Sequence, residues 1–254
     1  MYFSKKFTEF IDIKHCFFSK NGGVSKDIYR SLNCGPGSND EANNVLDNLE
    51  IISKKIGVSK NNLFLMNQTH SNKVVVINEN NKNVKRINAD AMITQLKNIA
   101  LSVLTADCVP VLIYDKVNHI VACIHAGWRG ALNGVIKNTL DEIIGMKKNN
   151  KIYAAVGPCI GVDNYEVGKE FYDKFIEENK KNEIFFFHSQ KDKFLFDLRR
   201  YVNFKIKEFD IEHIENIDLD TYTNKENFFS FRRSRQLGEK DYGRCISTIS
   251  LLNT

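Results

Sequence analysis

Apolar residues recur every three or four positions in several stretches of the chain, which is the spacing of one helix face. The clearest stretch covers 45–56, with a cluster of capping-type residues at 38–40 before it and Gly57 directly after it. Residues of these types start and stop helices, so we expect an amphipathic helix here. The same spacing predicts further helices over 132–144, just after the glycines of AGWRG, over 165–178 and over 198–209.

From residue 73 the period changes to compact runs rich in β-branched residues: KVVVIN, IALSVL, VPVLIYD, HIVACIHA and, later, KIYAAVG. Such runs predict strands, several of them buried on both faces. Strand runs that could form hairpins alternate with single helices, without a repeated βαβ period or a linker rich in Pro, Gly and Ser. We therefore expect an α+β fold, with one domain over 1–254 and mixed β-sheets flanked by helices.

Composition and charge narrow the choice of partners. The chain has 36 Lys+Arg and 31 Asp+Glu, a net charge of +5, which is too small for its size to indicate a nucleic-acid partner. No apolar run approaches the roughly 20 residues that span a bilayer, and the N-terminus has no secretory pattern. Six scattered cysteines without a C-x-x-C pair predict buried thiols in a reducing compartment. We expect a cytoplasmic protein that acts on small molecules and not on a membrane.

Three residues that can bind a metal fall at the edges of the predicted strands. His70 precedes one strand, Cys108 separates two, and His125 lies near the end of another. One Cys and two His form a ligand set that zinc accepts while a fourth position stays open for water, as in catalytic sites. The sequence separations match no zinc finger, so each residue keeps a simpler interpretation. Cys108 could be a small hydrophobe, His70 a turn residue and His125 a core histidine bonded to the backbone.

The acid beside Cys108 favours the metal interpretation. Asp107 lies in an otherwise apolar segment, where an unpaired carboxylate is costly, so it requires a specific partner. The free N–H of a ligand histidine is one candidate partner. A structural role, in which Asp107 caps a turn, accounts for it equally well.

Two basic segments are candidates for substrate binding. In HAGWRG, Gly127 and Gly130 let the backbone pass close to a ligand, the following helix offers N–H groups, and Arg129 adds a fixed charge that suits phosphate. The alternative is a tight turn with Trp128 in the core. The segment FFSFRRSRQLGEKDYGR is either a substrate clamp or a solvated basic loop. Its arginines are Arg232, Arg233, Arg235 and Arg244.

A series of short motifs runs along the chain: HCFFSKNGGVSKDIYRSLNCG, NQTHSNKV, DAMIT, TADCVPVLIYD, IHAGWRG, VGPCIG, YEVG and FFSFRR. In this order they resemble the bacterial laccase-domain family, also called the multicopper polyphenol oxidase-like or peptidoglycan editing factor family. The resemblance extends from about His15 to the C-terminus. So many ordered motifs make a chance match very improbable.

The resemblance implies a catalytic zinc site formed by His70, Cys108 and His125, with copper as an alternative metal in vitro. It also implies purine nucleoside phosphorylase activity on adenosine, inosine, guanosine and methylthioadenosine, which yields the base and ribose-1-phosphate, together with adenosine deaminase activity. The partners are then purine nucleosides and phosphate, and we expect Arg129 or Arg233 to hold the phosphate. The oligomeric state is left open.

Two positions depart from the family pattern. Asn48-Leu49 stands where an Asn-Arg pair is expected, and Asp220-Thr221-Tyr222 stands where Cys-Thr-Tyr is expected. The first departure removes an anion contact, and neither affects the three metal candidates. Three other functions stay open: a copper-dependent polyphenol oxidase, a metal-free cysteine hydrolase using Cys108, and a non-catalytic zinc-stabilised factor in peptidoglycan precursor editing. Six scattered histidines disfavour the first, because multicopper electron transfer needs further His-rich sites.

Overall fold

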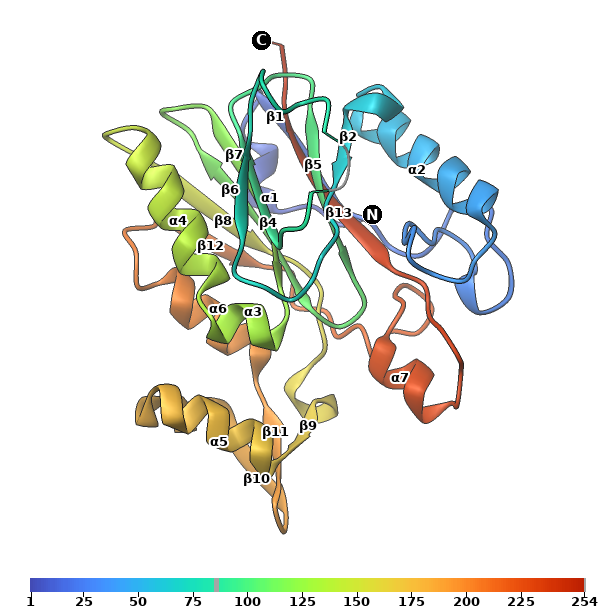
Figure 1. Cartoon of the computed structure of the whole chain (residues 1–254), viewed down its shortest axis with the longest axis vertical. Helices are drawn as coiled ribbons and strands as arrows, with labels where there is room; N and C mark the ends of the chain where they lie inside the picture. The colour runs from blue at the N-terminus through green and yellow to red at the C-terminus, as the bar shows by residue number, and fades with distance from the viewer. Residues whose placement is uncertain (85–86, 254) are drawn as a thin grey trace.

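The computed structural model describes residues 1–84 and 87–253. Within these residues the strands form three β-sheets (Figure 1). The six-stranded sheet has the spatial order β12 (His213–Asn216), β8 (Ile152–Val156), β6 (Val109–Asp115), β7 (Ile120–Ala126), β4 (Ala91–Thr94) and β3 (Val74–Ile77). The four-stranded sheet has the order β1 (Ile13–Phe17), β13 (Cys245–Leu251), β5 (Ala100–Thr105) and β2 (Leu63–Leu65). The three-stranded sheet has the order β10 (Phe186–Gln190), β11 (Lys193–Phe196) and β9 (Glu166–Gly168).

Helices flank these sheets, and both large sheets contain parallel as well as antiparallel pairs, so the expected α+β fold with mixed sheets is confirmed. In Figure 1, α2 lies beside the four-stranded sheet, and α4 and α6 lie on the opposite side of the molecule. The α-helices are α1 (Lys5–Thr8), α2 (Ala42–Ile56), α3 (Trp128–Leu132), α4 (Val135–Met146), α5 (Lys169–Glu178), α6 (Leu198–Ile206) and α7 (Phe231–Gln236). Four 3-10 turns complete the described elements: η1 (Asp27–Tyr29), η2 (Lys60–Asn62), η3 (Val162–Asn164) and η4 (Lys180–Phe185).

The strands β6 and β7 are buried along their whole length, as their uninterrupted apolar sequences predict. Side chains alternate between the two faces of a strand. Val111 and Ile113 therefore join the core under α4 and α6, whereas Leu112 and Tyr114 join the core against the four-stranded sheet. The six-stranded sheet thus separates two hydrophobic cores.

The boundaries of α2 agree with the sequence at one end only. Gly57 ends the helix in the left-handed conformation, with φ +89°, as expected of a C-terminal glycine. The helix begins at Ala42 after Glu41, which makes no side-chain capping bond. The carboxylate of Asp40 instead accepts hydrogen bonds from the Ser25 hydroxyl and the Asn33 amide. The polar cluster before the helix therefore joins an N-terminal loop and does not cap α2.

The helices predicted over 132–144 and 165–178 were placed too simply. The first prediction corresponds to α4, which begins only at Val135, because Gly134 adopts φ +91° and separates α4 from the short helix α3 before it. In the second region only α5 is helical. Residues 166–168 form β9, which pairs with β11, a partner that local periodicity does not reveal. The prediction over 198–209 overlaps α6, which ends at Ile206.

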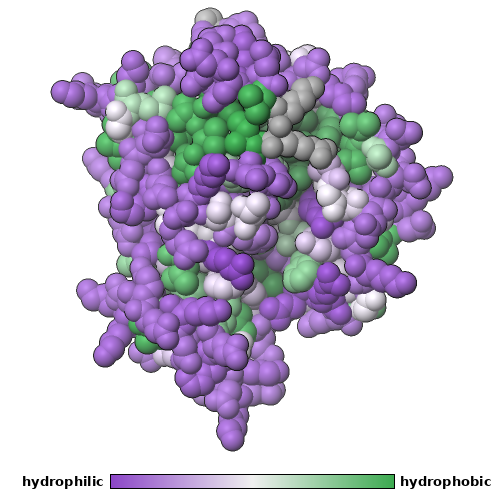
Figure 2. All heavy atoms as spheres, viewed as in Figure 1, coloured by the Kyte–Doolittle hydropathy of each residue, from purple (hydrophilic) through white to green (hydrophobic). Residues whose placement is uncertain are grey.

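The surface is mostly polar on the face shown in Figure 2, where hydrophilic side chains predominate and apolar ones gather in smaller areas between them. Among the described residues, no helix combines the length and apolar character that crossing a membrane requires.

His15 on β1 makes the stability of this fold dependent on pH. Its Nε2 accepts a hydrogen bond of 2.9 Å from the Ser4 backbone N–H, and its ring is packed against Phe7. Burial lowers the pKa of His15 to about 4, although nearby Glu215 acts in the opposite direction. An unfolded histidine has a pKa of roughly 6.5, so the stabilisation by neutral His15 is complete above that value and is lost as pH falls towards 4.

Between pH 7 and pH 4.5, we expect the free energy of unfolding of the wild type to fall by about 2–3 kcal/mol more than that of a His15→Gln variant. The amide oxygen of Gln can accept a hydrogen bond but does not titrate. Urea unfolding of both proteins at the two pH values measures the difference. Equal losses would show that another group titrates in this range.

Candidate metal centre

The three metal candidates of the sequence come together where the two large sheets meet. His70 lies in the loop from β2 to β3, Cys108 in the turn from β5 to β6, and His125 near the end of β7. The first two segments each leave the four-stranded sheet and enter the six-stranded sheet. The side-chain ligand atoms of the three residues lie within 4.8 Å of one another. Below, these three residues are called the triad.

The backbone at the triad is held in uncommon conformations. His70 has φ +58° and Asp107, next to Cys108, has φ +86°. Residues other than glycine adopt a positive φ at a cost in free energy, and they keep this conformation where surrounding hydrogen bonds stabilise it. The hydrogen bonds of two buried carboxylates, Asp90 and Asp107, supply that support.

Asp90 holds two members of the triad at once. It precedes β4 and is fully buried. Nδ1 of His125 donates to its carboxylate at 2.8 Å, and the backbone N–H groups of His70 and Ser71 donate to it at 3.0 and 2.7 Å. Burial acts to raise the pKa of Asp90, but the bonds from His125 and Ser71 prevail and hold it well below its usual range. Since Nδ1 of His125 is engaged, its Nε2 is the nitrogen available to a metal.

Asp107 binds structural groups from distant segments, and these partners differ from both the ligand histidine and the local turn that the sequence suggested. Its carboxylate accepts from the hydroxyls of Thr221 and Ser230, at 2.7 and 2.9 Å, and from the backbone N–H of Arg232 at 2.7 Å. Ser230 is the N-cap of α7, so Asp107 ties the turn that carries Cys108 to the start of this helix. Sequence reasoning missed Asp90 as the partner of the histidine, although the motif DAMIT contains it as an acid before an apolar strand.

Gly127 makes room for the triad. A Cβ atom at this position would lie 2.8 Å from Cδ2 of His70 and 3.1 Å from Sγ of Cys108. A Cβ atom at Gly130 would lie 2.8 Å from the carbonyl oxygen of Ser71. Both distances of 2.8 Å are too short for real contacts. The loop that carries His70 can therefore lie this close to HAGWRG only because positions 127 and 130 have no side chain.

The charges of Cys108 and His125 support each other. Burial alone would raise the pKa of the Cys108 thiol, but His125 and His70 lower it to about 6. Burial alone would lower the pKa of His125, but Cys108 and Asp90 raise it to about 9. Cys123 lies outside the triad and shows the contrast, because burial raises the pKa of its thiol. The triad therefore favours the thiolate, the form in which cysteine binds metals.

The ligand types of the triad and the spacing of one ligand pair are compatible with a tetrahedral metal such as zinc. Usual Zn–S and Zn–N bond lengths place ligand atoms about 3.5 Å apart, and Sγ of Cys108 lies 3.8 Å from Nε2 of His70. Among the residues that the structure describes, the triad is the one group of three or more His, Cys, Asp or Glu side chains close enough to share a metal ion, and it offers three ligands. Three protein ligands with one open position are typical of catalytic zinc sites.

Two cavities adjoin the triad, and His70 and Cys108 line both. The first has a volume of about 400 Å³; it is called the polar cavity after Gln68 and Arg244 in its lining, which also contains apolar residues such as Met66 and Leu104. The second, the aromatic cavity, has a volume of about 340 Å³ and is lined in part by Trp128, Tyr165, Phe171 and Arg232. A ligand at the triad can therefore extend in two directions with different chemistry.

The two arginines expected to bind substrate lie outside the linings of both cavities. Arg129 is exposed, with its guanidinium 5.1 Å from the centre of the Trp128 ring. The guanidinium of Arg233 donates to the backbone carbonyls of Thr221, Tyr222 and Phe228. Their neighbours in the sequence line the cavities instead: Arg232, 5.4 Å from the Tyr165 ring, and Arg244, 4.0 Å from the Tyr242 ring.

The two departures from the family pattern have structural roles. Leu49 is buried in the core between α2 and the four-stranded sheet, and the Asn48 amide donates to the Ser25 hydroxyl and to the carbonyls of Ser31 and Asn33. The carboxylate of Asp220 accepts bonds from the Gly161 N–H and the Asn164 amide. Both departures therefore organise loops or the core.

Comparison with known proteins shows the family to which this chain belongs. Residues 14–252 match the family described as multi-copper polyphenol oxidoreductase laccase. A protein of Rickettsia conorii named purine nucleoside phosphorylase is 35% identical over 235 residues, which cover 90% of this chain and 97% of the relative. A Haemophilus influenzae protein with the same name is 33% identical, covering 88% of this chain and 91% of the relative.

Solved structures agree with the sequence comparison. A Neisseria meningitidis protein superposes with a TM-score of 0.85 at 31% identity, over 96% of each chain. A hypothetical protein of Bacillus licheniformis, YfiH, superposes with a TM-score of 0.87 at 27% identity, over 94% of this chain and 92% of that chain.

Proposed function

This chain belongs to the multi-copper polyphenol oxidoreductase laccase family, and from that premise we propose that it is a zinc-dependent purine nucleoside phosphorylase with adenosine deaminase activity. Its substrates would be adenosine, inosine, guanosine or methylthioadenosine, together with phosphate. The proposed zinc ligands are His70, Cys108 and His125. We also propose that it works in the cytoplasm. The observation that carries the proposal is the triad, two of whose residues line both of two cavities with different side chains.

The aromatic cavity suits the purine. Flat aromatic groups bind a heterocycle by stacking and by burying its faces, and Trp128, Tyr165 and Phe171 provide three rings. Arg232, in the same lining, adds a positive charge that would stabilise the negative charge developing on the base as it leaves. The purine would therefore occupy this cavity, with its glycosidic bond towards the triad.

The polar cavity suits the phosphate. Arg244 is a permanent cation that binds oxyanions through paired N–H groups, and the amide of Gln68 lines the same cavity. In phosphorolysis an oxygen of phosphate forms a bond to C1′ while the bond from C1′ to the base breaks. A base and a phosphate in two cavities that both reach His70 and Cys108 would be brought close to each other at the triad, as this displacement requires.

A zinc ion bound to the triad would supply a Lewis acid at the reacting centre. The residues of this chain then have separate tasks: Asp90 orients His125 and the His70 loop, Arg244 holds the phosphate, and the aromatic cavity holds the base. Deamination of adenosine would replace the 6-amino group by oxygen from water, with release of ammonia, and requires no phosphate. The two activities would thus differ in their need for Arg244.

A multicopper oxidase is less consistent with this structure. Electron transfer between several copper ions requires more than one group of ligands. In residues 1–84 and 87–253, the triad is the group of three metal-capable side chains that the structure contains. The geometry supports one mononuclear site.

Product identity tests the proposed function. Zinc-loaded protein is incubated with adenosine, with and without phosphate, and the products are separated by chromatography. We expect adenine and ribose-1-phosphate only with phosphate, and inosine in both conditions. If neither adenine nor inosine forms, a non-catalytic role for the metal replaces the proposal.

Replacing Arg244 by Ala is expected to raise the Michaelis constant for phosphate about 10- to 100-fold, the effect of losing a charge-assisted hydrogen bond of about 1.5–3 kcal/mol. Deamination should stay within about threefold of wild type, because it uses no phosphate. Steady-state kinetics with varied phosphate measure both effects. Arg129→Ala, at an exposed position, is the matched control. If the Michaelis constant for phosphate rose only in this variant, Arg129, as the sequence suggested, and not Arg244 would bind the phosphate.

A further inference from the structure

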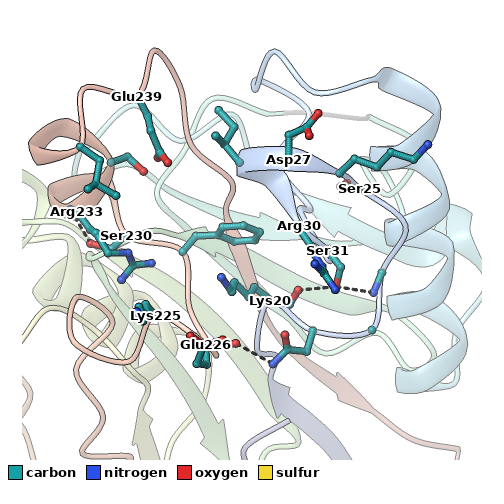
Figure 3. A pocket seen from close by; sticks show the side chains of 18 residues that line it. Lys20, Ser25, Asp27, Arg30, Ser31, Lys225, Glu226, Ser230, Arg233 and Glu239 are labelled. Atoms are coloured by element: carbon teal, nitrogen blue, oxygen red, sulfur yellow. Dashed lines mark hydrogen bonds between the residues drawn. The ribbon is translucent and has the colours of Figure 1, made fainter.

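A third cavity lies apart from the triad, between two segments distant in the sequence. Residues 20–31 form one wall and residues 225–239 form the other, around a volume of about 1090 Å³ (Figure 3). The helix α7 separates this cavity from the triad. Phe231 lines the two cavities at the triad, whereas Ser230, Arg233 and Ser234 line this third one, which we call the basic cleft.

Cations predominate in the basic cleft. Its positively charged side chains are Lys20, Lys26, Arg30, Lys225 and Arg233. In the described residues none of them forms a salt bridge with a carboxylate. Three carboxylates also belong to the lining, namely Asp27, Glu226 and Glu239, so the cleft keeps a positive net charge. Figure 3 shows cations in both walls: Lys20 and Arg30 in one, Arg233 and Lys225 in the other.

Both burial and the neighbouring cations act on Lys20. Burial, together with the nearby charge of Arg233, lowers the pKa of Lys20 more than Glu226 raises it. Like charges that gather without a counter-ion destabilise a protein, and an anion placed among them relieves this repulsion.

Two elements of the basic cleft, the backbone at Lys20 and the guanidinium of Arg233, are held in place by hydrogen bonds within the protein. The carbonyl of Lys20 accepts hydrogen bonds from the N–H groups of Ser31 and Leu32 and from the Ser31 hydroxyl, and Nζ of Lys20 lies 5.8 Å from the centre of the Phe229 ring. Three of the five N–H donors of Arg233 bind backbone carbonyls, which leaves two donors for a ligand. A preorganised site loses little conformational entropy on binding.

We propose that the basic cleft binds a phosphate-bearing small molecule of about the size of a mononucleotide, at a site separate from the triad. Converging Lys and Arg side chains recognise phosphate oxygens. The buried ring of Phe229 offers an apolar contact for the organic part of the ligand. Ligand cavities in proteins usually have volumes of about 300–1,000 Å³, and the basic cleft, at about 1090 Å³, is large enough for one such molecule. The three carboxylates in the lining oppose a long polyanion such as a nucleic acid.

Calorimetry on the zinc-loaded full chain tests the proposal, with adenosine 5′-monophosphate, adenosine and inorganic phosphate as separate probes. We expect the monophosphate to bind, inorganic phosphate to compete with it, and adenosine not to compete. Lys20→Met, which keeps the length of the side chain over Phe229, and the exposed Arg30→Ala should each weaken binding of the monophosphate at least about tenfold. Lys147→Met, which removes one positive charge after α4, should bind as the wild type does.

A Cys108→Ser variant separates this site from the proposed active site, because it alters the triad and leaves the basic cleft intact. Binding of the monophosphate should persist in this variant. Loss of binding there would assign the ligand to the triad and overturn the proposal. Unchanged affinity in both Lys20→Met and Arg30→Ala, or competition by adenosine as strong as by phosphate, would overturn it as well. These measurements do not depend on whether the chain catalyses phosphorolysis.

Discussion

Replacing Cys108 by Ala is expected to reduce the zinc content of the purified protein from about one ion per chain to nearly none, and to abolish both proposed activities. The triad contains three ligand side chains, and its thiolate is the only anionic one. Two histidines alone are a weak site for zinc. Because a metal Lewis acid contributes several kcal/mol to the stabilisation of a transition state, kcat/KM should fall at least about 1,000-fold.

Elemental analysis and the chromatographic assay measure the two effects on the same preparation. Cys245→Ala is the matched control, since it removes another mostly buried thiol at the start of β13, outside the triad. That variant should keep its zinc and its activity. Stoichiometric zinc in Cys108→Ala would exclude the triad as the metal site. Loss of zinc with full activity would support the triad as the metal site but would show that the metal takes no part in the reaction.

Replacing Asp90 by Asn is expected to weaken zinc binding about 10- to 100-fold, although Asp90 does not touch the metal. The carboxylate orients the ring of His125 and accepts hydrogen bonds from His70 and Ser71. In Asn an amide NH2 group replaces one carboxylate oxygen. It would face N–H and O–H donors, and it cannot accept hydrogen bonds from them. The free energy of unfolding of the zinc-free protein should also fall by about 3 kcal/mol, because buried donors lose their partner.

Zinc affinity is measured by competition with a chromophoric chelator, and stability by urea unfolding of the zinc-free proteins. Asp115→Asn is the matched control. Asp115 is also fully buried, and it accepts bonds from the Asn118 and Asn150 amides and the Lys151 N–H at the far end of β6. This variant should lose a comparable amount of stability while keeping its zinc affinity. Equal zinc affinities in both variants would contradict a positioning role for Asp90.

Local sequence pattern determined much of the secondary structure. Burial of β6 and β7 on both faces requires continuous apolar runs, so these strands are visible in the sequence itself. The helix α2 is visible for the same reason, because one face must be apolar and Gly57 can adopt the positive φ that ends it. The pattern misplaced a boundary where one position decides the path of the backbone, as at Gly134, whose positive φ separates α4 from α3 and delays the start of α4 to Val135.

Local pattern could not predict pairings between distant segments. The strand β13 lies between β1 and β5, and β9 is a strand because β11 pairs with it. Only three residues of β9 are extended, and nothing in them distinguishes a strand from the first turn of a helix. Such pairings depend on where the rest of the chain places the partner.

For the candidate site, the sequence by itself supplied the residues and the tertiary structure supplied their relations. His70, Cys108 and His125 could be proposed because their residue types suit zinc and their positions border predicted strands. Only the folded chain shows that Asp90 binds His125, that Asp107 secures α7, and that Arg232 and Arg244 line the cavities. The physical reason is that a side chain's direction depends on the packing of elements far apart in the sequence, which residue type and local spacing do not encode.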